Sequence, residues 1–354
     1  MVDNFVSGNI EPHGDVYLVT GSHGHIGSYI VEELAKHKDD ISIICVDNLY
    51  NGSVDNLQET YVHAYHSGGA HGPPKNVNIV PVIADITDEK AMRETFLRYL
   101  PNYVFHCASY LTLDSNKYKS KSVKVNVYGS ALLFELCLEY GVNKIVYSSS
   151  ASVYGTPIEI PTKEDYPFDD CKLLYGTSKV GLEYIVKSFM GFGLDIVGLR
   201  YFNVYGPRQS FSNVYTQIVP KWINAIATGE TITVYGDGTQ TMDMIFGADI
   251  GRANISAMDN DECGNMFINV GTGIQTSVKD LLEIITYRMG KLMDNPKINV
   301  EYEEHDPNLV KRRCADVEKM HKYLGSHQVD VEQGIDLTCK ELYKRATEWQ
   351  SHNG

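Results

Sequence analysis

Short apolar runs alternate with amphipathic stretches through the first 200 residues of the chain. Runs typical of buried strands occur at 15–20, 41–46, 78–83, 103–107, 143–148 and 195–200. Stretches with apolar residues at helical spacing lie between most of them, at 28–37, 88–98, 123–140 and 176–191. Strands that alternate with helices predict a parallel sheet covered by helices on both faces. The pattern therefore predicts an α/β fold with a doubly wound parallel sheet.

The pattern changes after Asn203 and becomes mixed. Helical stretches are predicted at 217–228, 277–289, 316–323 and 333–348, and strands at 231–235, 267–270 and 297–303. This order predicts a smaller, mixed α/β lobe. At the other end of the chain, residues 1–14 lack the charged and apolar regions of a signal peptide and are expected to form a mobile tail.

The first strand-like run leads through a glycine-rich loop into a helix. Gly21, Gly24 and Gly27 are spaced G-x-x-G-x-x-G between the run at 15–20 and the amphipathic stretch at 28–37. A tight turn, a close approach of backbone to pyrophosphate and close helix packing each require a missing side chain. Phosphate would lie at the helix N-terminus. The arrangement predicts a dinucleotide-binding domain of the Rossmann type.

An acidic residue ends the second apolar run. Asp47 lies about 20 residues after Gly27, where a carboxylate suits the hydroxyls of the adenosine ribose. Asn48, Leu49 and Tyr50 follow, and none of them is an arginine that could bind a 2′-phosphate. NAD is therefore predicted as the cofactor in preference to NADP.

A tyrosine and a lysine have a spacing that suits proton transfer. Tyr175 and Lys179 form a Y-x-x-x-K pair, and Ser150 ends a run of three serines upstream. On a helix, residues i and i+4 share a face, so the ammonium would lie beside the phenol and lower its pKa from about 10. With Ser150 holding the substrate oxygen, Tyr175 is predicted to act as general base toward a secondary alcohol.

Several further segments give the chain a resemblance to a known family. They are Asp85-Ile86, His106 to Ser109, Asn126 to Gly129, Ser148 to Gly155, Arg200 to Arg208 and Tyr235 to Gly238. Over about residues 15–345 the chain resembles the extended short-chain dehydrogenase/reductases that act as nucleotide-sugar epimerases and dehydratases, and it is most similar to the UDP-glucose 4-epimerase-like members. The resemblance implies an NAD-binding Rossmann domain at 15–200. Residues 201–354 would mainly form the nucleotide-sugar-binding lobe, with some segments returning to the sheet.

The resemblance also implies a set of cofactor contacts. These residues are Gly21, Gly24, His25, Ile26, Gly27, Asp47, Asn48, Tyr50, Asn51, Gly52, Asp85, Ile86, Cys107, Ala108, Ser109, Asn126, Ser148, Tyr175, Lys179 and Phe202.

The implied substrate contacts come from both parts of the chain. They are Ser150, Ser152 and Tyr175 at the sugar, Asn203 at the diphosphate, and Gln217, Val219, Trp222 and Tyr235 at the uracil and ribose. Many relatives carry an arginine at the position of Met242, where it binds the diphosphate. Arg312 and Arg313 are the predicted replacements, since a bidentate guanidinium suits phosphate.

The residues after Ser150 indicate the type of reaction. Ala151 and Ser152 stand where the 4,6-dehydratases of this family carry Asp-Glu, and the UDP-glucuronate decarboxylases carry Glu at the position of Ser152. Elimination without an acid and a base would be very slow. The stretch is similar to that of the 4-epimerases, which need no second acid. Their 4-keto intermediate turns over in the pocket and takes the hydride back on its other face.

Composition narrows the possible partners. The net charge of −14 argues against nucleic acid or a membrane surface, because both are polyanionic. Seven cysteines without C-x-x-C spacing fit free thiols in a reducing compartment, so a cytoplasmic location is predicted. His63, His66 and His71 lie in a Gly- and Pro-rich segment without a nearby carboxylate, so no metal site is predicted.

The sequence therefore predicts an NAD-dependent UDP-hexose 4-epimerase. Other nucleotide-sugar enzymes of the family stay open: a C2-epimerase, a UDP-uronate 4-epimerase, a decarboxylase or a reductase. A catalytically silent nucleotide-binding scaffold is a third hypothesis, but the intact Ser150, Tyr175 and Lys179 argue against it. The helices around 123–140 and 176–191 are expected to pair with their copies in a homodimer, because Leu132, Leu133, Leu136, Leu138, Val180, Ile185 and Phe189 place apolar groups on more than one face.

Overall fold

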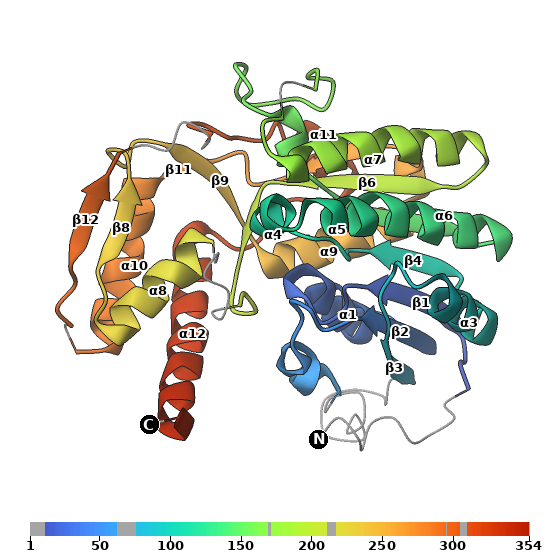
Figure 1. Cartoon of the computed structure of the whole chain (residues 1–354), viewed down its shortest axis with the longest axis horizontal. Coiled ribbons are helices and arrows are strands. Elements are labelled where there is room, and N and C mark those ends of the chain that lie inside the picture. Colours follow the sequence, from blue (N-terminus) through green and yellow to red (C-terminus); the bar gives the residue numbers. More distant parts are fainter. Residues whose placement is uncertain are drawn as a thin grey trace.

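A large lobe built on a parallel sheet and a smaller lobe beside it make up the molecule (Figure 1). The computed structural model describes residues 11–61, 76–168, 171–210, 217–294, 296–304 and 310–353. The large sheet contains seven strands: β1 Asp15–Thr20, β2 Ile41–Asp47, β3 Val77–Ile83, β4 Tyr103–His106, β5 Lys144–Ser150, β6 Ile196–Tyr201 and β10 Phe267–Val270.

The sheet has the order β10-β6-β5-β4-β1-β2-β3, and every pair in it is parallel. The chain winds outward from β1 to one edge and from β4 to the other, so the strand order reverses between β1 and β4. In open sheets of this kind, ligands bind at the carboxyl ends of the strands on either side of such a reversal. The predicted fold class, a doubly wound Rossmann sheet with a smaller lobe, is confirmed.

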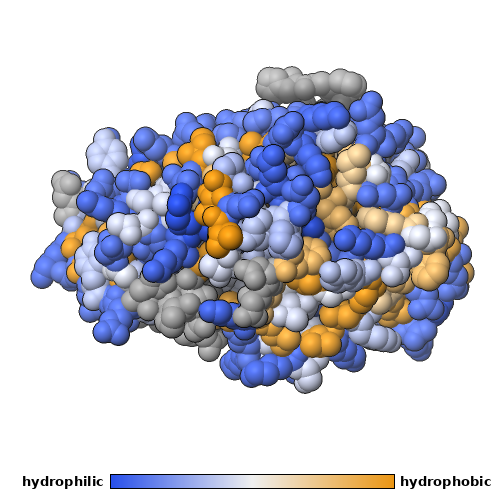
Figure 2. All heavy atoms as spheres, turned by 90° about the horizontal axis from the view of Figure 1, so that it is seen from above, coloured by the Kyte–Doolittle hydropathy of each residue, from blue (hydrophilic) through white to orange (hydrophobic). Residues whose placement is uncertain are grey.

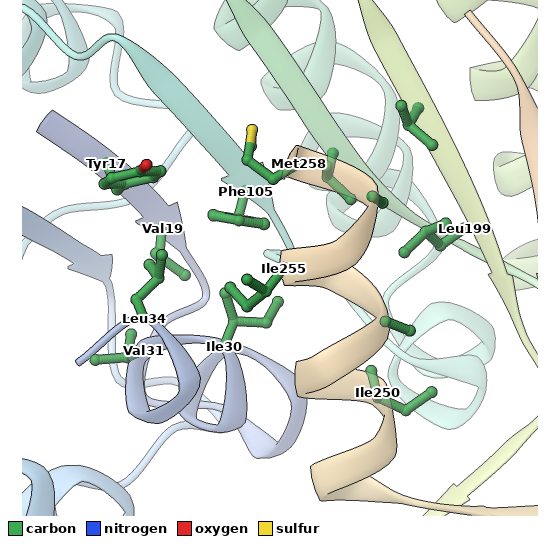
Figure 3. Packing of buried hydrophobic residues seen from close by; sticks show 14 of the residues in the cluster. Tyr17, Val19, Ile30, Val31, Leu34, Phe105, Leu199, Ile250, Ile255 and Met258 are labelled. Atoms are coloured by element: carbon green, nitrogen blue, oxygen red, sulfur yellow. The ribbon is translucent and has the colours of Figure 1, made fainter. Parts of the chain in front are cut away.

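Two helices cover one face of the large sheet. Helix α1 (His25–His37) and helix α9 (Gly247–Asp259) run side by side, and α11 (Glu318–Tyr323) lies near β10. Figure 3 shows apolar side chains of α1 and α9 meeting those of the sheet, including Ile30, Ile255 and Phe105. Helix α9 was not predicted, although it packs against the first helix of the chain.

Three helices cover the opposite face: α3 (Glu89–Tyr99), α6 (Ser130–Glu139) and α7 (Leu174–Gly191). The predicted helix at 123–140 is divided, because helix α5 (Lys119–Val123) continues into a π-helical segment, η3 (Lys124–Gly129), before α6 begins. The short helix α4 (Thr112–Lys117) precedes it. Leu132, Leu133 and Leu136 are all buried in this core, so they do not supply the second, exposed apolar face on which the dimer was predicted.

The smaller lobe is mixed, as predicted. It holds the strands β7 Asn203–Tyr205, β9 Thr241–Phe246 and β11 Gln275–Ser277 in one sheet, and β8 Ile232–Tyr235 with β12 Val300–Glu303 in another. Helices α8 (Ile218–Thr228), α10 (Val278–Leu292) and α12 (Val331–Asn353) pack around them on a separate core. Strands β7, β9 and β11 were not predicted, and β9 leads directly into α9, which belongs to the large lobe. The remaining short elements are the 3₁₀ turns η2 Val54–Leu57, η4 Ala151–Tyr154 and η5 Asp261–Cys263.

The N-terminal segment is tied to the sheet before β1 begins. The backbone N–H of His13 donates to Ser42 Oγ, and Ser42 Oγ donates to the His13 carbonyl. Residues 1–10 of the predicted tail lie outside the described residues, as do His63, His66 and His71. In the parts of the chain that the structure describes, no three His, Cys, Asp or Glu side chains are grouped as metal ligands.

The surface is mainly polar. Figure 2 shows polar residues over much of this face, with hydrophobic residues in a group near the middle and in patches on the right of the view. No helix among the described residues combines the length and the apolar character needed to cross a bilayer.

Candidate active site

A cavity of about 560 Å³ opens at the carboxyl ends of β1, β2, β4, β5 and β6 and extends toward the smaller lobe. Its lining includes residues of the glycine loop, Ser150 and Tyr175, and from the second half of the chain Phe202, Asn203, Gln217 and Arg313. The tertiary structure thus brings most of the predicted cofactor and substrate residues to one site.

The glycine loop leaves no room for side chains. Gly21 has a positive φ of 67°, and a Cβ there would lie 2.8 Å from Ala108 N. A Cβ on Gly27 would lie 2.1 Å from the Gly21 carbonyl oxygen, and one on Gly24 would lie 3.1 Å from it. The loop therefore holds the start of α1 close against β1 and β4, which leaves the helix N-terminus facing the cavity for an anionic group.

Asp47 is held at the end of β2 by backbone amides. Its Oδ2 accepts from the N–H of His23 at 2.9 Å, and its Oδ1 accepts from the N–H of Leu49 at 2.8 Å. Gly52 packs against the carboxylate, since a Cβ there would lie 3.0 Å from Asp47 Oδ2. The carboxylate lines the cavity in a fixed orientation, with no arginine beside it on the loop at 48–52.

Asp85 joins the loops that follow β2 and β3. Its Oδ2 accepts from Asn48 Nδ2 at 2.8 Å, and its Oδ1 accepts from both the N–H and the hydroxyl of Thr87. Burial acts to raise the pKa of Asp85, but these hydrogen bonds outweigh it and lower the pKa below the usual value. Asp85 is therefore a structural anion at the edge of the cavity.

One segment that lines the cavity near the predicted cofactor contacts was not predicted from the sequence. Residues 110–114 follow the predicted Cys107, Ala108 and Ser109 and line the cavity. Asp114 accepts hydrogen bonds from Tyr50 OH and Asn51 Nδ2, and the rings of Tyr50 and Tyr110 lie 4.9 Å apart. The sequence could have predicted this segment as part of the site, because these residues follow the carboxyl end of β4, next to the point where the strand order reverses.

Three of the predicted cofactor contacts do not line the cavity: Asn126, Ser148 and Lys179. The side-chain amide of Asn126 is fully buried and bonds to both the N–H and the carbonyl of Tyr110. Ser148 Oγ donates to Cys107 Sγ at 3.3 Å. From behind the cavity wall, Asn126 and Ser148 thus hold Tyr110 and Cys107 in place.

The predicted catalytic residues come from two adjacent elements. Ser150 ends β5, and Tyr175 lies in the first turn of α7, where both side chains line the cavity. Lys179 lies one turn further along α7, where its Nζ donates to the Ser148 carbonyl at 2.8 Å and sits 5.7 Å from the centre of the Tyr175 ring. Ser150 Oγ also donates to Ser152 Oγ at 3.1 Å.

The pKa shifts differ from the prediction. Burial is the largest effect on Tyr175 and raises its pKa, while the hydrogen bond with Ser150 and the charge of Arg313 act to lower it. Burial also lowers the pKa of Lys179 to about 8. The prediction that Lys179 lowers the pKa of Tyr175 is therefore wrong for this structure. The pKa is raised, because desolvation exceeds the effect of nearby charge. Arg313, and not Lys179, is the cation whose charge opposes this rise in the pKa of Tyr175.

The predicted substrate residues divide into three groups. Ser152, Asn203, Gln217 and Arg313 line the cavity, and Asn203 Oδ1 is buried without a hydrogen-bond partner among the described residues. Val219 and Trp222 do not line it. Both are about 1% exposed in the core of the smaller lobe, and the Trp222 indole N–H donates to the Thr233 carbonyl. These two assignments are corrected, since neither side chain reaches the cavity.

Tyr235 and Arg312 lie on the outside of the smaller lobe. Tyr235 is 39% exposed at the end of β8, and Arg312 is exposed with its Nε donating to Gln275 Oε1. Neither lines the cavity, so both are also corrected. Arg208 and Gln209 do line it and were missed, although they lie at the end of the Arg200–Arg208 stretch and just after it.

Comparison with known proteins agrees with this geometry. Residues 17–271 match the model of the NAD dependent epimerase/dehydratase family. A UDP-glucose 4-epimerase of Drosophila melanogaster is 31% identical, over 95% of this chain and 96% of its own. A UDP-N-acetyl-alpha-D-glucosaminuronate decarboxylase of Bacillus cytotoxicus is also 31% identical, over 91% of this chain and 96% of its own. The crystal structure of a UDP-glucose 4-epimerase of Thermotoga maritima with UDP-glucose covers 93% of this chain and is itself covered to 99%, with 30% identity and a TM-score of 0.81.

Proposed function

The chain belongs to the NAD dependent epimerase/dehydratase family, and we propose that it interconverts the C4 epimers of a UDP-hexose. The enzyme class predicted from the sequence, an NAD-dependent nucleotide-sugar epimerase, agrees with the family and with the UDP-glucose 4-epimerases among its relatives. The observation that carries the choice of reaction is the set of groups around Tyr175.

The carboxylates that line the cavity are engaged elsewhere. Asp47 accepts from backbone amides, Asp85 from Asn48 and Thr87, and Asp114 from Tyr50 and Asn51. Ala151 and Ser152, which follow Ser150, offer no carboxylate. Among the described lining residues, the groups placed to move a proton at the sugar are therefore Ser150 and Tyr175. This set suits removal and return of one hydroxyl proton, but not elimination of water.

The residues present fit NAD. The loop at Gly21, Gly24 and Gly27 is a cradle that Cβ atoms would fill, and the N-terminus of α1 faces it. Asp47 would hold the adenosine ribose hydroxyls, and Tyr50, Asn51 and residues 110–114 would cover the cofactor. When bound, NAD supplies a reversible hydride acceptor at the sugar carbon.

The protein groups then act on the substrate oxygen. Ser150 would orient the C4 hydroxyl through its Oγ, and Tyr175 would take the hydroxyl proton and later return it. Lys179, held by the Ser148 carbonyl at 2.8 Å, would support the tyrosine from the next turn of α7. Asn203 and Gln217 would hold the nucleotide end while the sugar ring turns over. Tyr201, Phe202 and Val204 line this part of the cavity and would exclude water from it once the substrate is bound.

The test is a panel of UDP-sugars incubated with the purified protein and followed by proton NMR. We expect UDP-glucose and UDP-galactose to interconvert without net consumption of added NAD⁺. Steady formation of NADH would indicate a dehydrogenase, release of CO₂ from a UDP-uronate a decarboxylase, and a 4-keto-6-deoxy product a dehydratase. Any of these as the main reaction would contradict the proposal.

We also propose that the protein acts as a homodimer in a reducing compartment, the cytoplasm. Val123, Tyr128, Leu138 and Tyr184 are between 36% and 58% exposed on the outer side of the helices at 119–139 and 174–191. Large exposed apolar groups on one side of a molecule are typical of an interface. None of the seven cysteines, all of which lie in the described part of the chain, forms a disulfide, which supports the reducing compartment.

A further inference from the structure

Arg313 places a cation in the cavity, and no carboxylate among the described residues pairs with it. Its backbone N–H donates to the Thr241 carbonyl at 3.2 Å, which anchors the residue beside β9. Its side chain lines the cavity, and its Nε is buried with no hydrogen-bond partner among the described residues. Burial lowers the pKa of Arg313, as expected for a guanidinium that has lost water and gained no carboxylate. A buried charge without a partner is costly.

The other cation in the cavity lining is already paired. Arg208 donates to Glu32, and its guanidinium carbon lies 4.4 Å from the centre of the Tyr29 ring. The neighbouring Arg312 points outward to Gln275. Within the described part of the chain, Arg313 is therefore the cavity-lining cation that is available to an anionic ligand.

The position of Arg313 relative to Tyr175 restricts which part of a substrate it can meet. Arg313 lines the same cavity as Tyr175 and Ser152, and its charge acts to lower the pKa of the phenol. In the proposed reaction, the phenol marks the place of the C4 hydroxyl. On a hexopyranose, the C6 group is attached at C5, next to C4, whereas the diphosphate is attached at C1 on the far side of the ring. An anion that meets Arg313 is thus more readily supplied by C6 than by the diphosphate.

We propose that Arg313 binds a carboxylate at C6 of the sugar, so that the preferred substrate is a UDP-hexuronate rather than a neutral UDP-hexose. The inference rests on the proposed function and makes its substrate class more specific. A guanidinium can hold a carboxylate through two parallel hydrogen bonds, which provides both charge and orientation. A neutral C6 hydroxymethyl group would leave the same guanidinium uncompensated.

The experiment compares the wild type, Arg313→Met and Lys311→Met with UDP-glucuronate and UDP-glucose. Methionine keeps much of the length of the side chain and removes the charge, and Lys311 is an exposed basic residue on the same segment. We expect the wild type to have the higher kcat/KM for UDP-glucuronate. Arg313→Met should lower the ratio of the two kcat/KM values by about 10²-fold, the scale of losing one partner of a buried charge pair. Lys311→Met should keep the ratio within about threefold.

Binding measurements separate the carboxylate from the diphosphate. Calorimetry with UDP alone should give the same affinity for the wild type and Arg313→Met, whereas UDP-glucuronate should bind more weakly to the variant. If UDP and both sugars weaken equally, Arg313 binds the diphosphate and the inference is wrong. A wild type that prefers UDP-glucose overturns it as well, and this comparison needs no variant to fold.

The experiments distinguish a failure of the proposed epimerase function from a failure of the carboxylate site at Arg313. If the wild type epimerises no UDP-sugar, that function is wrong, while the calorimetric comparison still tests the carboxylate site. If UDP-glucuronate loses CO₂ and the loss depends on Arg313, the carboxylate site is supported and the C4 epimerase is not. Partial recovery of UDP-glucuronate binding in Arg313→Lys would support a role for the charge.

Discussion

At the scale of single residues, the proposed chemistry depends on how burial and charge act on Tyr175 and Lys179. Burial raises the pKa of the phenol and lowers the pKa of the ammonium to about 8. The Ser150 hydroxyl and the Arg313 charge oppose the effect on Tyr175. A tyrosine that must act as a base near neutral pH therefore depends on these partners as well as on the lysine that the sequence pairs with it.

Tyr175→Phe removes the ionisable oxygen and keeps the ring. We expect turnover to fall by about 10²–10⁴-fold, the usual range for a positioned proton-transfer group, while NAD stays bound. The measurement is the rate of UDP-sugar epimerisation by NMR, together with NAD content. Tyr287→Phe, at an exposed position on α10, is the matched control and should keep full activity. Near-normal turnover in Tyr175→Phe would mean that another residue is the base.

Burial of the charged Lys179 should lower the free energy of unfolding at neutral pH when NAD is absent. Its pKa falls from about 10.5 to about 8 on folding. Between these values the unfolded chain holds a proton that the folded protein has released, so the free energy of unfolding rises with pH, by about 3 kcal/mol in total. Below pH 8 the cost is fully present, and above about 10.5 it is gone.

Lys179→Met removes that cost together with one hydrogen bond to Ser148. We expect the NAD-free variant to be more stable than the wild type at pH 7 by roughly 1–3 kcal/mol, and inactive. Urea unfolding from pH 7 to 10 measures the difference, which should stay nearly constant up to about pH 8 and shrink as the pH rises further. A constant difference across this range would show that Lys179 is not buried as an ammonium.

At the scale of elements, the glycine loop decides whether β1 and α1 can meet the cofactor. We expect Gly27→Ala to abolish NAD binding and to destabilise the protein by more than about 2 kcal/mol, because the new Cβ would lie 2.1 Å from the Gly21 carbonyl. Absorbance of bound NAD and thermal unfolding measure the two effects.

Gly181→Ala is the matched control. Gly181 lies within α7, and a Cβ there meets no heavy atom within 4 Å. Alanine favours a helix over glycine by up to about 1 kcal/mol, so this variant should be more stable and keep its NAD. If Gly27→Ala binds NAD as well as Gly181→Ala does, the glycine loop is not the pyrophosphate site.

At the scale of the whole molecule, exposed apolar groups on the large lobe predict the oligomeric state. We expect light scattering to give a dimer, and Tyr184→Asp on α7 to shift it toward monomer by placing a charge in the interface. Tyr302→Asp, on the exposed strand β12 of the smaller lobe, should leave the dimer intact. A wild type that is monomeric at all concentrations would rule out the interface.

The sequence by itself determined the features that depend on local chemistry. All six predicted strands of the first 200 residues lie within one or two residues of β1 to β6, because a buried parallel strand needs a short apolar run. Gly21, Gly27 and Asp47 could be assigned because a tight turn and a ribose contact each demand one type of residue. The order of these elements was sufficient for the fold class.

Only the tertiary structure decided the features that depend on distant packing. Arg312 and Arg313 are adjacent and chemically equal, yet the pairing of residue 312 with Thr241 turns one toward solvent and the other into the cavity. Trp222 is apolar on a helix beside the site, and only the core of the smaller lobe shows that it faces inward. The raised pKa of Tyr175 likewise follows from its burial in the folded protein. Local spacing shows which groups are present, whereas desolvation and register decide what each of them can do.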